Sequence, residues 1–132
     1  MPFTATYDPA LRILCVTVEG AVSPDTLDAA LATITSAKEY PPNVDTIWVF
    51  RDANFAVVHA EEMRNMRDVR KRYSNREGSF TALVVTDDVA FGMSRMFQAL
   101  SDGVVTAQHL LVTRSLADAR QWIAESRASR AP

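Results

Sequence analysis

A short apolar segment that leads directly into a capped helical pattern constrains the fold of this chain more than any other feature. Residues 80–100 read FTALVVTDDVAFGMSRMFQAL, an apolar run followed by Thr86-Asp87-Asp88 and then by Met and Phe residues at helical spacing. A buried strand that feeds a capped helix is the repeating unit of an α/β sheet. The segment therefore predicts an α/β fold, although it indicates no particular chemistry.

The size and composition of the chain predict one domain. Its 132 residues are 48% hydrophobic and 23% charged, which is typical of a globular protein with one core. We expect this domain to span residues 1–126, and the polar segment 127–132 to be a frayed tail. The formal net charge of −2 argues against nucleic acid as a partner.

The start of the chain and its apolar runs bear on the expected compartment. The opening residues MPFTATYD lack the basic and apolar regions of a secretory signal. No continuous apolar run approaches the length of a membrane span, so we expect no stable membrane insertion. The single cysteine, Cys15, lies within a predicted strand, where an inert, half-buried thiol is the expected state. A cytoplasmic protein is the resulting prediction.

Hydrophobic periodicity, helix caps and turn residues predict the element order ββαβαβαβα. The strand at 45–50 has apolar side chains on both faces, so we place it centrally in a mixed sheet of four to five strands. In the helix that follows Asp88, we expect one buried stripe of large apolar side chains, with Phe91 displaced from it: Val89, Met93, Met96, Phe97 and Leu100. The predicted elements are the strands Phe3–Tyr7, Arg12–Glu19, Asp45–Phe50, Phe80–Thr86 and His109–Thr113, and helices that start at Ser23-Pro24-Asp25, span Ala60–Tyr73, follow Asp88 and begin at Ser115.

Four segments, in this order and spacing, resemble the SpoIIAA-like, or STAS-like, superfamily, in particular its bacterial STAS/SEC14 domain-containing proteins. They are VTVEGAVSPDTLDAAL, IWVFRDANF, LVVTDDVAFGMSRMF and SLADARQWI. The resemblance implies a STAS-like fold and a general tendency to bind proteins or ligands. The family's anti-anti-sigma factors carry a phosphorylatable serine at the helix after the third strand, but residues 57–62 here read VVHAEE. Without a hydroxyl there, the phosphorylation switch cannot be carried over to this chain.

Polar residues follow three of the predicted strands, where parallel α/β sheets place their ligands. Arg51 and Asp52 follow the third strand, Asp87 and Asp88 the fourth, and Arg114 the fifth. If these ends converge, arginines and carboxylates share one rim that could bind a small anion or the charged groups of a partner. A structural role is the alternative, because Asp87 is placed as a helix cap and an arginine there can pair with a nearby carboxylate. The remaining candidate ligand- or partner-binding residues are His59, Phe91 and Arg95.

The sequence gives little support for catalysis. His59 and His109 lack metal-ligand spacing, and neither a nucleophile elbow nor a phosphate-binding glycine loop is present. We therefore expect no cofactor, no metal and no enzymatic activity. The basic residues between 64 and 76 are interpreted as a solvated helix face.

The leading hypothesis is a non-enzymatic binding or regulatory domain that takes a protein partner or a small apolar or anionic ligand. Two alternatives stay open. One is an enzyme acting on a small anionic substrate at the rim of strand ends, and the other is an oligomerising scaffold protein, with a homodimer as the simplest form.

Overall fold

In the computed structural model, which describes residues 3–41, 44–55, 58–72, 79–101 and 109–130, five strands form one mixed sheet. The strands lie in the order β1-β2-β3-β4-β5, with β1 antiparallel to β2 and all other neighbours parallel. The predicted α/β class and the order of its elements are confirmed. The elements are β1 (Phe3–Asp8), β2 (Ile13–Ala21), α1 (Pro24–Ser36), β3 (Asp45–Asn54), α2 (Ala60–Arg72), β4 (Phe80–Val85), α3 (Asp88–Ser101), β5 (His109–Thr113) and α4 (Leu116–Arg130).

The hairpin of β1 and β2 turns at Asp8-Pro9, a turn-forming pair that lies between the two predicted strands. The Asp8 carboxylate accepts hydrogen bonds from the backbone N–H groups of Ala10 and Leu11, at 2.9 and 3.1 Å from Oδ1. Such local bonds from an aspartate are typical of tight turns. Arg12 then takes a left-handed conformation, with φ of 54°, before β2 begins.

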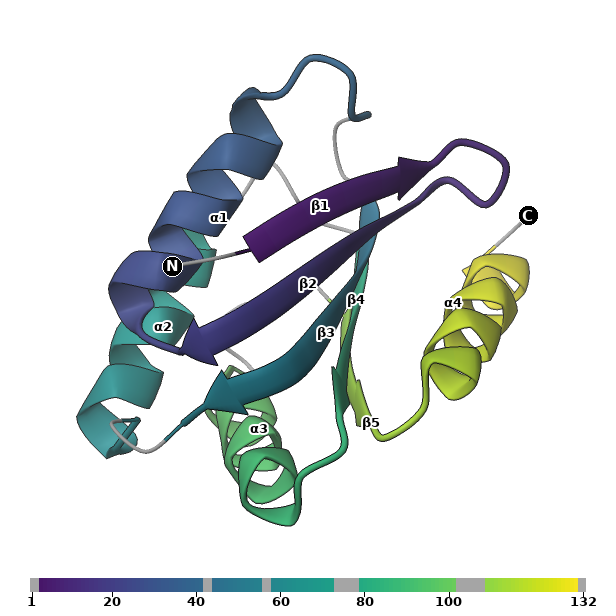
Figure 1. Cartoon of the computed structure of the whole chain (residues 1–132). Coiled ribbons are helices and arrows are strands. Elements are labelled where there is room, and N and C mark those ends of the chain that lie inside the picture. The colour runs from purple at the N-terminus through teal and green to yellow at the C-terminus, as the bar shows by residue number, and fades with distance from the viewer. Residues whose placement is uncertain (1–2, 42–43, 56–57, 73–78, 102–108, 131–132) are drawn as a thin grey trace.

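The three crossover helices, α1, α2 and α3, cover one face of the sheet, and α4 covers the other (Figure 1). Crossovers between parallel strands are right-handed, and each step from β2 to β5 moves the chain in the same direction across the sheet. Successive crossovers of that kind place their helices on the same side. Helix α4 follows the last strand and is free to pack against the opposite face.

Helix α1 begins at the predicted residues. The Ser23 side chain accepts a hydrogen bond from the Thr26 N–H at 3.2 Å, and Thr26 Oγ1 accepts one from the Ser23 N–H at 2.9 Å. This reciprocal capping box satisfies two backbone donors of the first turn. Pro24 occupies the first helical position, where the absence of its N–H costs no hydrogen bond.

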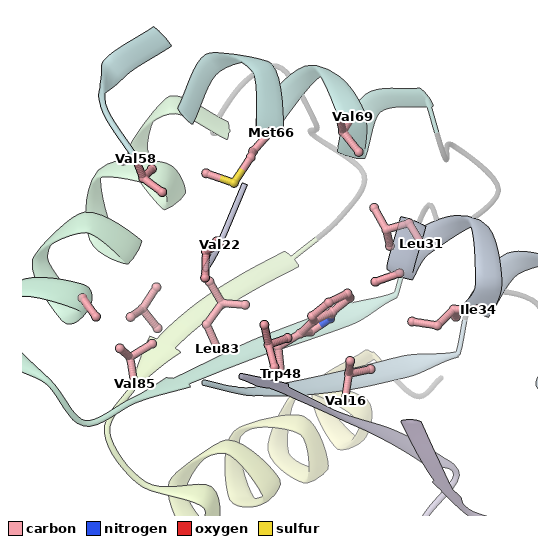
Figure 2. Packing of buried hydrophobic residues seen from close by; sticks show 14 of the residues in the cluster. Val16, Val22, Leu31, Ile34, Trp48, Val58, Met66, Val69, Leu83 and Val85 are labelled. Carbon is pink, nitrogen blue, oxygen red and sulfur yellow. The ribbon is translucent and has the colours of Figure 1, made fainter. Parts of the chain in front are cut away.

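The larger core lies between the sheet and the three crossover helices. Figure 2 shows Trp48, Leu83 and Val85 pointing from the sheet toward the helices, and Met66 and Val69 pointing from α2 toward the sheet. Trp48 and Phe50 of β3 contribute to this core, and the alternating Ile47 and Val49 pack on the other face. The prediction of a central strand with two apolar faces is thus confirmed.

Helix α4 forms a smaller core with the opposite face of the sheet. Ala119 and Ile123 are fully buried there, and the Trp122 ring meets the Phe80 ring edge-on at a centroid distance of 5.7 Å. The helix extends to Arg130, so the tail predicted to fray from residue 127 is helical as far as that residue. Arg127 is the physical reason, because its guanidinium bonds to Asp45 and to the carbonyls of Leu11 and Arg12.

The buried stripe predicted for α3 is wrong in two positions. Val89 is 70% exposed and Met96 is 51% exposed, whereas the small residues Ala90 and Ser94 are buried against the core. Phe91, which was expected to lie off the stripe, is half-buried and packs on the same core. Other differences are small: β3 continues four residues past Phe50, and Tyr73, predicted as part of α2, lies outside the described residues.

Candidate functional site

Three of the predicted site residues lie together where β4 and β5 end. Arg114 Nη1 is 2.7 Å from Asp88 Oδ1, and its guanidinium carbon lies 4.2 Å from the centre of the Phe91 ring. Arg114 also donates to the Thr86 carbonyl oxygen at 3.1 Å. We call Asp88, Phe91 and Arg114 the rim cluster. Its ion pair is exposed, with 48% of the Arg114 side chain and 90% of the Asp88 side chain accessible, so it contributes little stability.

Asp87 serves as the N-cap of α3. Its Oδ1 accepts the N–H of Ala90 at 2.8 Å, which satisfies one backbone donor in the first turn of that helix. Its carboxylate is therefore engaged in starting the helix. The sequence left two roles open for Asp87, a ligand-binding residue and a helix cap. The geometry supports the helix cap.

The other predicted site residues do not join the rim cluster. Arg51 and Asp52 are exposed residues within β3, and Asp52 has a left-handed φ of 51°. His59 is exposed and its carbonyl oxygen accepts the N–H of Met63 at the start of α2, while Arg95 is exposed on α3. Within the described part of the chain, no hydrogen bond or ion pair links these four residues to the rim cluster. The predicted site is thus divided among separate positions.

A cavity of about 80 Å³ lies between the sheet and the crossover helices. Its wall is almost entirely apolar, and it is formed by side chains from the four strands β2 to β5, the three helices α1 to α3 and the segments that follow β2 and β3. The lining residues are Val18, Val22, Thr26, Leu27, Leu31, Trp48, Phe50, Phe55, Val58, Met63, Met66, Arg70, Thr81, Leu83, Met93, Ser94, Phe97 and Leu110.

The packing of the helices explains why space remains there. Helices α3 and α4 approach the strand backbones closely, whereas α1 and α2 make their closest contacts with neighbouring helices. Met66 points from α2 into the space above Leu83 and Trp48 of the sheet (Figure 2), and Met63 lines the same cavity. Flexible methionine side chains adapt to irregular space and to different occupants.

The Thr81 hydroxyl interrupts the apolar wall at the end of the cavity where β3 and β4 begin. Thr46 and Thr81 are paired across these strands, and their Oγ1 atoms lie 3.4 Å apart. Trp48 Nε1 donates to Thr46 Oγ1 at 3.2 Å. The Trp48 ring can therefore line the cavity while its N–H is satisfied within the protein.

Arg70 is the functional candidate that the sequence interpretation missed. It was included in the basic run of α2 as part of a solvated face, yet it is only 7% exposed and lines the cavity. Its guanidinium carbon lies 5.7 Å from the centre of the Phe97 ring, within the range of a cation–π contact. A signal was present, because position 70 follows Met63 and Met66 at helical spacing on the buried side of α2.

Comparisons with known proteins provide no information on function, so the functional argument rests on the fold and the cavity. The chain matches no protein-family model, and neither a curated protein nor a solved structure matches it. Among the described residues, no helix is long and apolar enough to cross a membrane, and no group of three or more His, Cys, Asp or Glu side chains is placed to hold a metal ion. The class defined by fold and site is an α/β domain with an apolar cavity under its crossover helices.

Proposed function

We propose that this chain is a non-enzymatic, cytoplasmic binding domain of the STAS-like type, which holds a small apolar ligand in the cavity between its sheet and helices α1–α3. The observation that carries the proposal is the cavity itself, lined by apolar side chains from both layers of the fold. Binding sites for small molecules are concave and mostly apolar, with few polar groups to fix orientation. The lining of this cavity has that composition.

The exposed apolar wall supports a binding role. The cavity is partly open at the surface, so its apolar side chains meet water. A ligand that covered this wall would remove apolar area from water, and this gain would contribute to its affinity.

The geometry of the rim favours the cavity over an active site at the strand ends. Asp87 caps α3, and Arg114 pairs with Asp88 and stacks on Phe91. These interactions give structural roles to the charged residues that an enzyme acting on a small anionic substrate would need. We therefore place ligand binding beneath the helices.

A pair of substitutions at Ser94 tests the proposal. This side chain is 3% exposed and lines the cavity from α3. Ser94→Leu places a branched apolar group in the space, while Ser94→Ala leaves it open and removes the same hydroxyl. Leu and Ala both favour helix more than Ser does, so both variants should fold.

Hexanol is a suitable neutral probe, and binding can be measured by saturation-transfer NMR and by the shift in thermal unfolding. We expect hexanol to bind the wild type and Ser94→Ala with similar affinity and to stabilise both. Its affinity for Ser94→Leu should fall by at least about tenfold, which corresponds to 1.4 kcal/mol. Equal binding to the two variants, or no binding to the wild type, would contradict the proposal.

A further inference from the structure

The outward surface of α3 carries exposed apolar side chains. This helix packs against β4, β5 and α2 (Figure 1), and the side of it that faces away from the core is open to solvent. Three large apolar side chains are exposed in the described part of the chain, and two of them, Val89 and Met96, lie on this surface. Exposed apolar residues that gather at one place are typical of an interaction surface.

The exposed residues of α3 are arranged symmetrically about Gly92. Val89 precedes Gly92 by three positions and Met96 follows it by four, so both lie about 40–60° to one side of it around the helix. Asp88, four positions before, and Arg95, three positions after, lie at the same angles on the other side. We call these pairs the apolar flank and the charged flank. A Cβ atom at Gly92 would meet nothing within 4 Å, so the space above the helix backbone is open between the two flanks.

A second copy of α3 complements both flanks when a two-fold axis passes beside Gly92. Such an axis makes the two helices antiparallel and places each flank beside the same flank of the other copy. Because each residue rises about 1.5 Å, Val89 comes within about 1.5 Å of the height of Met96 in the second copy. Asp88 and Arg95 of the second copy match in the same way. Glycine at the crossing lets the two backbones approach closely.

The charged flank is able to form these pairs. Arg95 is exposed, and its side chain has no hydrogen bond or ion pair with any other described residue. Asp88 pairs with Arg114 through Oδ1, but 90% of its side chain is accessible, which leaves room for a second guanidinium. Opposite charges across an interface fix its register and disfavour other partners. This complementarity favours a second copy of the chain as the occupant of the surface.

The area of the contact determines its strength. A crossing of two helices covers less than the total of about 1,200 Å² that stable complexes bury. We therefore expect a transient association, with a Kd of roughly 10 µM to 1 mM.

We propose that this chain forms a symmetric, transient homodimer in which two copies of α3 cross at Gly92. Val89 of each copy packs on Met96 of the other, and Asp88 of each copy pairs with Arg95 of the other. The dimer goes beyond ligand binding and does not depend on the cavity.

Analytical ultracentrifugation of the wild-type protein between about 10 µM and 2 mM tests whether the dimer forms. The average mass should rise with concentration from that of a monomer toward that of a dimer. A mass that stays monomeric over this range would overturn the proposal.

Two charge reversals locate the contact. Arg95→Glu and Asp88→Arg each place like charges opposite one another, so each variant alone should dimerise at least about tenfold more weakly than the wild type. A mixture of the two variants restores opposite charges in a mixed dimer, so association should return. The substituted positions are exposed, so both variants should fold.

Arg120→Glu is the matched control, because it makes the same charge change at an exposed position of α4, on the other face of the sheet. It should change the dimer Kd by less than about twofold. An equal loss in Arg120→Glu and Arg95→Glu, or no association in the mixture of charge reversals, would overturn the proposed contact. The wild-type series and this control decide the question even if Asp88→Arg does not fold.

Gly92→Gln tests the crossing point without a change of charge. The open space at this position should let the monomer fold, whereas in the dimer the added side chains would hold the two backbones apart. We expect dimerisation to weaken by at least about tenfold, and Ala117→Gln, at an exposed position of α4, to leave it unchanged. Dimerisation of Gly92→Gln with the wild-type Kd would show that the copies do not cross there.

Discussion

Arg127 connects the last helix to the start of two strands, and its removal should destabilise the whole domain. Its Nε donates to Asp45 Oδ2 at 2.8 Å, and its Nη1 and Nη2 donate to the carbonyls of Leu11 and Arg12 at 2.6 and 2.7 Å. Asp45 Oδ1 also accepts the N–H of Phe80 at 2.8 Å. One carboxylate and one guanidinium thus hold α4, the β1–β2 turn, β3 and β4 together.

The expected magnitude follows from the exposure of the two partners. The Asp45 side chain is 7% exposed, and that of Arg127 is 26% exposed. Breaking a buried ion pair by removing one partner costs about 3–5 kcal/mol. Water can reach Arg127 and can replace its bonds to the exposed turn, which lowers the figure. We therefore expect Arg127→Met, which retains the apolar stem, to lower the free energy of unfolding by about 2–3 kcal/mol.

Urea denaturation of four proteins measures this effect: the wild type, Arg127→Met, Asp45→Asn and the double variant. The cycle should give a coupling of more than about 1 kcal/mol, because the two side chains interact directly. Arg120→Met is the matched control, since it removes an exposed arginine from the same helix, and its effect should stay within about 0.5 kcal/mol. A loss below about 1 kcal/mol for Arg127→Met, or no coupling, would refute the reasoning.

Three further predictions concern single positions. Gly92→Ala should stabilise the protein by about 0.5–1 kcal/mol in urea denaturation, because a Cβ atom there would meet nothing within 4 Å; a loss of stability would show a contact that the structure lacks. Val89→Lys should change stability by less than about 0.5 kcal/mol, since Val89 is 70% exposed. A loss above about 1.5 kcal/mol would indicate that Val89 is buried, as the sequence predicted. Burial raises the pKa of the Cys15 thiol, against a smaller lowering by Arg120. The unfolded thiol therefore ionises first, so the stability of the wild type should fall relative to Cys15→Ala as pH rises above about 8.5, and parallel pH profiles would contradict that cause.

Local signals in the sequence were sufficient for the order of elements. Ser23 and Pro24 start α1 where the cap pattern predicts it, because capping depends on residues adjacent in sequence. The alternation in β3 located a strand with two apolar faces, because a central strand packs against both layers. The extension of α4 past Ser126 could not be predicted, because it depends on contacts between Arg127 and residues more than a hundred positions away.

The candidate site was predicted less well than the fold. Topology correctly placed Asp88 and Arg114 at one edge of the sheet, but the sequence could not show that they pair with each other. The stripe expected on α3 consisted of large apolar side chains. The surface of that helix next to the core instead carries the small residues Ala90 and Ser94. Arg70 was missed because a charged residue among other basic residues is normally solvated.

The most direct test of the cavity as a ligand site is methyl NMR on methionine. Met63, Met66 and Met93 line the cavity, and Met96 is 51% exposed on the same helix as Met93. With [methyl-¹³C]methionine labelling and hexanol as the probe, binding should shift the three cavity methyl signals in a saturable way and leave that of Met96 unchanged. Shifts at Met96 equal to those in the cavity, or no saturable shift at Met63, Met66 and Met93, would contradict the account.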